Sequence, residues 1–145
     1  MSGSYAVRRA VHTDDVALHA MHAACFRADT AAIDPTRGHW FVAFEHRNPE
    51  ELVAFCGLTP THAQPGAIGY LKRVGVLPGH RGAGLQRRLV EESAVQATRN
   101  GWSSIIADTT DNPISANNLI ACGYRIYKPA EPWGITQTIY WRKLL

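Results

Sequence analysis

The fold of this chain is decided by residues 76–85, which read VLPGHRGAGL, and by the amphipathic segment that follows them. A β-branched strand ends in a loop with three glycines and two basic side chains, and the loop opens directly onto a helix. Glycines let successive backbone N–H groups turn toward one point, and a helix start adds unpaired N–H groups and a positive dipole end. This arrangement predicts a site for an anion, and a pyrophosphate fits it best.

Two common phosphate-binding loops do not match this stretch. A P-loop requires Lys and Ser or Thr after its last glycine, whereas Gly84 is followed by Leu85 and Gln86. A dinucleotide-binding fingerprint requires a third glycine where Arg87 stands, and it opens a domain rather than lying past mid-chain. Nucleotide hydrolysis and dinucleotide binding are therefore not expected.

Composition limits the class of protein further. A chain of 145 residues suffices for one ordinary domain with its own core. The net charge is +3 and the basic residues are dispersed, which argues against nucleic-acid binding. No apolar run approaches the roughly 20 residues of a membrane span, and no signal-peptide block opens the chain. Cys25, Cys56 and Cys122 are odd in number and widely spaced, so we expect a reducing cytoplasm, no disulfide framework and no metal.

Periodicity and turn residues predict an alternation of strands and helices. Thr13 is the expected N-cap of the first helix, with Leu18, Met21 and Cys25 on its buried side. The second helix begins at Leu85, and the third runs from 113 to 122 between an Asn-Pro start and a glycine end. The predicted strands are 5–11, 39–45, 52–58, 67–76, 104–108, 124–127 and 135–144.

This order of elements predicts a mixed α/β (α+β) fold. The strands on either side of the second helix must be parallel, because a crossover joins them. The turn-forming residues 47–50 indicate an antiparallel hairpin between the second and third strands. Gly69 and Gly75 lie inside the fourth strand, where a glycine often marks a bulge or the close approach of another backbone. We expect a mixed sheet with helices on both faces.

The motifs resemble those of the GNAT family of N-acetyltransferases. Arg81 and Gly84 match the first and fourth positions of the family's coenzyme A loop, Gln/Arg-x-x-Gly-x-Gly/Ala, and Gln86 departs from it at the sixth. Downstream, residues 112–115 (NPIS) and Gly123-Tyr124 resemble the family's Asn-x-x-Ser/Ala helix that ends in Gly-Phe/Tyr. The two matches lie in the order and at the distance that the family has.

The resemblance implies a single acetyltransferase domain over residues 1–145, with a mostly antiparallel sheet of six or seven strands. It also implies acetyl-CoA as co-substrate and an acyl-CoA-dependent N-acyltransferase activity. The cofactor-binding residues that it implies are Val74, Val76, Arg81, Gly82, Ala83, Gly84, Leu85, Gln86, Asn112, Ser115 and Leu119.

The implied reaction is direct transfer of the acetyl group to an amine in a ternary complex. Backbone N–H groups near Val74 and Val76 would stabilise the developing oxyanion. The family often has a tyrosine where this chain has Leu119 and a glutamate where it has Lys72, so the usual acid and base are both missing. The residues that could supply acid–base chemistry are His39, Glu45, His62 and Tyr70.

The acceptor is a small-molecule or peptide amine of unknown identity. Lys72 and Arg73 are adjacent on a strand, so their side chains should point to opposite faces and one should lie toward the acceptor. A cation there would favour an acceptor with an acidic group. We expect a monomer or homodimer with no nucleic-acid or membrane partner. The alternative is a non-catalytic CoA-binding or regulatory domain on the same fold, which the missing acid and base favour.

Overall fold

The computed structural model of the protein describes residues 4–28, 31–61 and 67–145. Within these ranges, no helix is long and apolar enough to cross a membrane. The strands are β1 (Tyr5–Arg9), β2 (His39–Glu45), β3 (Asn48–Pro60), β4 (Ile68–Val76), β5 (Ser104–Thr109), β6 (Arg125–Ile126) and β7 (Ile139–Leu144), and the helices are η2 (His12–Asp14, a 3-10 helix), α1 (Asp15–Cys25), α2 (Leu85–Arg99) and α3 (Pro113–Ala121).

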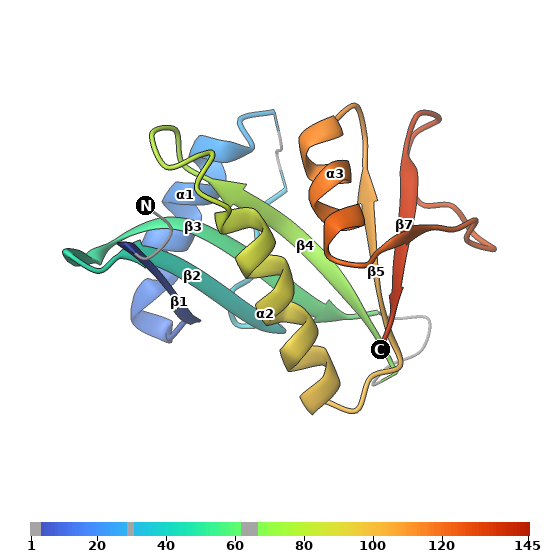
Figure 1. The fold of residues 1–145 in the computed structure, drawn as a ribbon, viewed down its shortest axis with the longest axis horizontal. Helices are drawn as coiled ribbons and strands as arrows, with labels where there is room; N and C mark the ends of the chain where they lie inside the picture. Colours follow the sequence, from blue (N-terminus) through green and yellow to red (C-terminus); the bar gives the residue numbers. More distant parts are fainter. Residues whose placement is uncertain (1–3, 29–30, 62–66) are drawn as a thin grey trace.

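The seven strands form one sheet in the order β1-β2-β3-β4-β5-β7-β6. The pair β4–β5 is parallel and α2 is its crossover, whereas the other five pairs are antiparallel. Helices lie on both faces: α2 crosses the front of the sheet in Figure 1, and α1 lies behind it. The predicted fold class is therefore confirmed.

The parallel pair β4–β5 is short and then opens. Ile68, Gly69 and Tyr70 pair with Ser104, Ile105 and Ile106, and no further pair joins β4 to β5 in the described chain. Figure 1 shows the two strands diverging beyond this point, toward the end where α2 and α3 begin. In the described part of the chain, residues 71–76 of β4 consequently have no strand partner on the β5 side.

Two clusters of buried apolar residues hold the helices to the sheet. Leu85, Leu89 and Val90 of α2 pack against one face, as the helical spacing predicts. On the other face, Leu18 and Met21 of α1 join a cluster on β2 and β3. Cys25, the third residue of the predicted α1 stripe, is half-buried. The β2 and β3 members of the α1 cluster are Trp40, Val42, Leu52 and Phe55.

A bulge in β4 changes where its side chains point. The register slips between the pairs Phe55–Gly75 and Gly57–Lys72, and Arg73 has φ 53°, which is left-handed backbone. A Cβ on Gly57 would point toward Trp40, on the α1 face of the sheet. Gly57 pairs directly with Lys72, and directly paired residues share a face, so the Lys72 side chain also leaves the α1 face. The Arg73 guanidinium lies 5.8 Å from the ring of Phe26, just past α1. The prediction that Lys72 and Arg73 point to opposite faces is therefore wrong, because the bulge interrupts the alternation.

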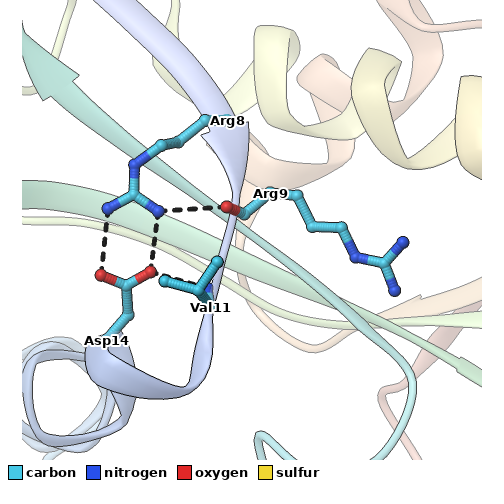
Figure 2. Close-up of polar contacts among 4 residues, drawn as sticks. All are labelled: Arg8, Arg9, Val11 and Asp14. Carbon is cyan, nitrogen blue, oxygen red and sulfur yellow. Dashed lines mark hydrogen bonds and ion pairs between the residues drawn. The ribbon is translucent and has the colours of Figure 1, made fainter.

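The start of α1 differs from its prediction. Thr13 does not cap the helix. Instead, Asp14 accepts the backbone N–H of Val11 at 2.8 Å, and both of its oxygens contact the Arg8 guanidinium, at 2.8 and 3.0 Å (Figure 2). Arg8 also donates to the carbonyl of Arg9 at 3.1 Å. Asp14 is 8% exposed, so the ion pair ties β1 to the start of α1 with its carboxylate largely buried and its guanidinium partly in water.

Two other boundaries also shift. The hairpin turn is His46-Arg47 rather than 47–50, because β3 already begins at Asn48. The last strand begins at Ile139 rather than at residue 135, since Thr138 donates its N–H to the Ile135 carbonyl in a turn.

Side chains, rather than the predicted backbone, closely approach Gly69, and replacement of this glycine should be costly. A Cβ at this position would lie 2.7 Å from two ring carbons of Trp102 and 3.0 Å from Leu58. We expect Gly69→Ala to lower the free energy of unfolding by about 1–3 kcal/mol, measured by denaturant titration, because the strand pair β4–β5 must shift to admit the methyl group. The loss should shrink in a Trp102→Phe background, which removes the crowded ring carbons. An equal loss in both backgrounds would contradict this explanation.

Candidate functional site

A cavity of about 620 Å³ opens where β4 and β5 diverge. Its walls come from the end of β4, the β4–α2 loop and the first turns of α2 and α3, with the end of α1 at one side. This volume is in the range of pockets that bind small molecules and cofactors.

One end of the cavity is built to hold an anion. Gly82 and Gly84 have φ values of 83° and 77°, a left-handed conformation that glycine adopts without strain. Gly84 is the N-cap of α2, and the first turn of this helix holds no acidic residue. Arg81 and Arg87 also line this end, and Arg81 is anchored by a hydrogen bond from Nε to the Val76 carbonyl, 2.9 Å long. The local charge is therefore positive from side chains and helix dipole alike.

Gln86 connects the two helices that flank the cavity. Its amide donates to the Ser115 hydroxyl at 2.9 Å and accepts from the Asn118 amide at 2.7 Å. Asn112 caps α3 by accepting the backbone N–H of Ser115 at 3.1 Å. The residue that departs from the loop pattern thus forms polar contacts with α3 and holds the first turn of α2 against it.

The strand wall of the cavity consists of Val74, Gly75 and Val76. These residues belong to the part of β4 that has no partner on the β5 side in the described chain, so backbone groups are available there. Cys25 and Phe26 line the cavity from the end of α1, and a Cβ on Gly75 would lie 3.1 Å from the Cys25 sulfur. Burial raises the pKa of the Cys25 thiol, which favours its neutral form.

Most of the predicted cofactor-binding residues meet at this cavity. Ala83 and Leu119 do not line it: Ala83 packs against the main core, and Leu119 is 4% exposed within that core. The predicted residues that line the cavity are Val74, Val76, Arg81, Gly82, Gly84, Leu85, Gln86, Asn112 and Ser115. The lining residues that the sequence analysis missed are Cys25, Phe26, Gly75, His80, Arg87, Ile114 and Asn118.

Glu45 lies one contact away from the cavity. His80 lines the cavity, and its Nδ1 is 2.9 Å from the Tyr5 hydroxyl and 3.6 Å from Oε1 of Glu45. Tyr5 and Glu45 face each other across the β1–β2 pair. Arg47 also contacts the Glu45 carboxylate, at 2.9 Å. Glu45 therefore holds the loop residue His80 in place and does not itself line the cavity.

His39 lies at the wrong end of α2 for a role at this cavity. Its ring nitrogens contact Arg9 at 2.8 Å and Asn100 at 3.0 Å, and Asn100 is the C-cap of α2. A helix of 15 residues puts its two ends about 22 Å apart. Burial, with a smaller contribution from Arg9, lowers the pKa of His39. His62 lies outside the described residues.

Tyr70 lies at the last β4–β5 pair, on the α1 face of the sheet. Its hydroxyl donates to Oδ2 of Asp108 at 2.5 Å, and the Trp133 indole donates to the same oxygen at 2.7 Å. Burial and the Asp108 carboxylate raise the pKa of Tyr70 well above its ordinary value. The phenol is therefore a hydrogen-bond donor at neutral pH and is poorly suited to accept a proton.

Comparison with known proteins finds solved acetyltransferase structures with the same fold. The chain is similar to yncA of Salmonella typhimurium, solved with its cofactor acetyl-CoA (TM-score 0.76, 17% identity, 97% of this chain and 93% of that chain covered). It is also similar to a Bacillus subtilis acetyltransferase in complex with CoA (TM-score 0.72, 16% identity, 97% and 99% covered). A GNAT-family acetyltransferase from Staphylococcus aureus aligns as well (TM-score 0.74, 14% identity, 97% and 99% covered).

At these identities the likeness to solved structures is one of fold. No curated protein matches the chain. A family model described as the acetyltransferase (GNAT) family matches residues 6–124, which include the whole β4–α2 loop and the start of α3. The glycine loop at the start of α2 and the opening between β4 and β5 agree with this match. The chain therefore belongs to the GNAT family of acetyltransferases.

Proposed function

We propose that this protein transfers an acetyl group from acetyl-CoA to a primary amine. The observation that carries the proposal is a cavity that joins the glycine-rich loop before α2 to the part of β4 without a partner on the β5 side. A pyrophosphate would rest on the loop at Gly82–Gly84, and the pantetheine arm would run between β4 and α3. The thioester would then lie beside Val74–Val76, where backbone N–H groups can stabilise the oxyanion.

The reaction needs no covalent intermediate on the protein. The ammonium group of the acceptor first loses one proton to solvent, and the neutral amine then attacks the thioester carbon. A C–N bond forms, and the tetrahedral intermediate collapses with cleavage of the C–S bond. The CoA thiolate takes up a proton, and the proton lost from nitrogen passes to solvent. A thiol of pKa about 8.5 leaves as thiolate near neutral pH, so Leu119 in place of a tyrosine acid is tolerable.

We propose that the acceptor carries an acidic group as well as the amine. The Arg73 side chain lies on the α1 face of the sheet beside Phe26, which lines the cavity, and the Lys72 side chain projects from the same face. Cations in this position repel polyamines and basic peptides, and they favour a carboxylate or phosphate by about 1–4 kcal/mol at contact distance.

The test follows release of thiol from acetyl-CoA with a panel of amines in matched pairs, with and without a carboxylate. We expect turnover with at least one amine, and faster turnover for the carboxylate-bearing member of its pair. That preference should fall in Lys72→Ala or Arg73→Ala. Equal turnover within every pair would contradict the acidic acceptor.

Calorimetric titration with acetyl-CoA separates the alternative function. Tight binding without thiol release for any amine would support a non-catalytic CoA-binding or regulatory domain. Absence of acetyl-CoA binding would overturn both functions.

A further inference from the structure

We propose that Asp108, framed by the rings of Tyr70, Trp133 and Tyr140, binds the ammonium group of the acceptor. This inference rests on the proposed acetyl transfer and names the residue that selects a cationic amine. Asp108 is not part of any motif discussed above, and it does not line the cofactor cavity.

The hydrogen bonds of Asp108 leave one carboxylate oxygen available. Both donors, the Tyr70 hydroxyl and the Trp133 indole, bind Oδ2. Among the described residues, none donates to Oδ1, and no lysine, arginine or histidine forms an ion pair with Asp108. A carboxylate that is oriented by two donors but forms no ion pair is suited to bind a cation from a ligand.

Asp108 lies across the β4–β5 opening from the thioester position. Tyr70 and Ile106 form the last pair before the strands diverge, and Asp108 follows two residues later on β5. Ala107 belongs to the core under α2, so alternation puts Asp108 on the opposite, α1 face. Arg73 interacts electrostatically with Tyr70. The carboxylate is therefore on the face where an acceptor can approach without meeting α2, α3 or the cofactor loop.

The surrounding rings add a second attraction for a cation. The Trp133 ring lies 6.2 Å from Tyr70 and 4.6 Å from Tyr140 in edge-on arrangements. Trp133 is 45% exposed, so part of its surface remains open to a ligand. Ammonium groups bind to the faces of such rings as well as to carboxylates. If Asp108 served only to fix the 127–138 segment, nothing would require a charged group rather than an asparagine.

The experiment uses a cation that cannot become an amide. Protonated N,N-dimethylphenethylamine carries the positive charge, but its nitrogen has no second hydrogen that an acetyl group could replace. 2-Phenylethanol is its neutral counterpart. Binding of both is measured by calorimetry to the CoA-saturated protein, and inhibition is measured against the fastest amine of the panel. We expect Asp108→Asn to weaken the cation by about tenfold or more and to leave 2-phenylethanol unchanged, since a hydrogen-bonded charge pair is lost.

Two matched variants separate charge recognition from structure. Glu131→Gln makes the same charge change on an exposed residue of the same segment, and it should bind the cation as the wild type does. Tyr70→Phe keeps the carboxylate and the ring but removes one orienting donor, so any weakening of cation binding should be smaller than in Asp108→Asn. Thermal unfolding of each variant records any loss of stability.

The outcomes distinguish this inference from the proposed function. Equal binding of the cation by wild type and Asp108→Asn would overturn the ammonium site, even if the wild type acetylates amines. Parallel loss of cation and 2-phenylethanol binding would also overturn it, because it would indicate a purely structural role. Absence of acetylation would instead overturn the proposed function, and calorimetry would still decide the ammonium site.

Discussion

Replacing Gly84 with glutamate is expected to weaken acetyl-CoA binding by about 100-fold or more. Gly84 is the left-handed N-cap of α2 and lines the cavity, and a Cβ there meets no atom within 4 Å. The new carboxylate would therefore enter open space next to the bound pyrophosphate. It would also cancel the positive end of the helix dipole. Calorimetric titration of the purified variant gives the dissociation constant.

The matched control is Gly84→Gln, which has the same size and the same backbone strain without the charge. A left-handed backbone costs a residue with a side chain about 1–2 kcal/mol, and both variants pay it equally. We expect the glutamine variant to retain clearly more affinity than the glutamate variant. If the two bind acetyl-CoA equally, the loop does not hold the pyrophosphate.

Asp14→Ala is expected to lower the free energy of unfolding by about 2 kcal/mol. The change removes both contacts with Arg8 and the acceptor of the Val11 N–H, and it leaves Arg8 without its partner (Figure 2). The side chain of Arg8 is 38% exposed, so water partly screens the ion pair. The expected loss in the free energy of unfolding is therefore smaller than for a fully buried pair. For a chain of this length the melting temperature should fall by roughly 4–8 °C.

The same pair should make stability depend on acid. Hydrogen bonds from Arg8 hold the pKa of Asp14 below its ordinary value in the folded protein, against the opposing effect of burial. Its contribution is therefore present above the ordinary pKa of aspartate, about 4, and is lost as the pH falls through the folded value. Wild type and Asp14→Ala should approach each other in stability below about pH 4. A constant difference in stability between wild type and Asp14→Ala at every pH would contradict this account.

Local patterns in the sequence were enough to predict the sheet and the glycine-rich turn before α2. The glycines of the β4–α2 loop and the apolar spacing of α2 are contiguous signals, so they predict a strand, a turn and a crossover helix together. The same is true of Asn112, whose side chain caps α3 as predicted. His80 lies within the loop and Arg87 lies just after it in the first turn of α2, and both line the cavity, so the same stretch could have indicated them.

Features that depend on distant partners could not be predicted. Cys25 and Phe26 reach the cavity because α1 packs across β3 and β4, which no local pattern reveals. The bulge at Arg73 follows from pairing with β3, and it reverses the expected direction of a side chain. Thr13 does not cap the first helix, because Asp14 occupies the helix start and binds Arg8 on β1. Asp108 has no signal of its own, since its surroundings come from Tyr70 and Trp133, which lie 38 and 25 residues away in sequence.

The short β4–β5 pairing also has a consequence for hydrogen exchange. The two halves of the sheet are joined by three residue pairs, so amide hydrogens of residues 71–76 that face the opening lack a protecting strand. They should exchange with solvent far faster than amides in the β2–β3 hairpin, through local fluctuations rather than global unfolding. A ligand that fills the cavity should cover the amides of Val74, Gly75 and Val76 and raise their protection by an amount that grows with its concentration. Hydrogen exchange in this part of β4 would then report occupancy of the cavity.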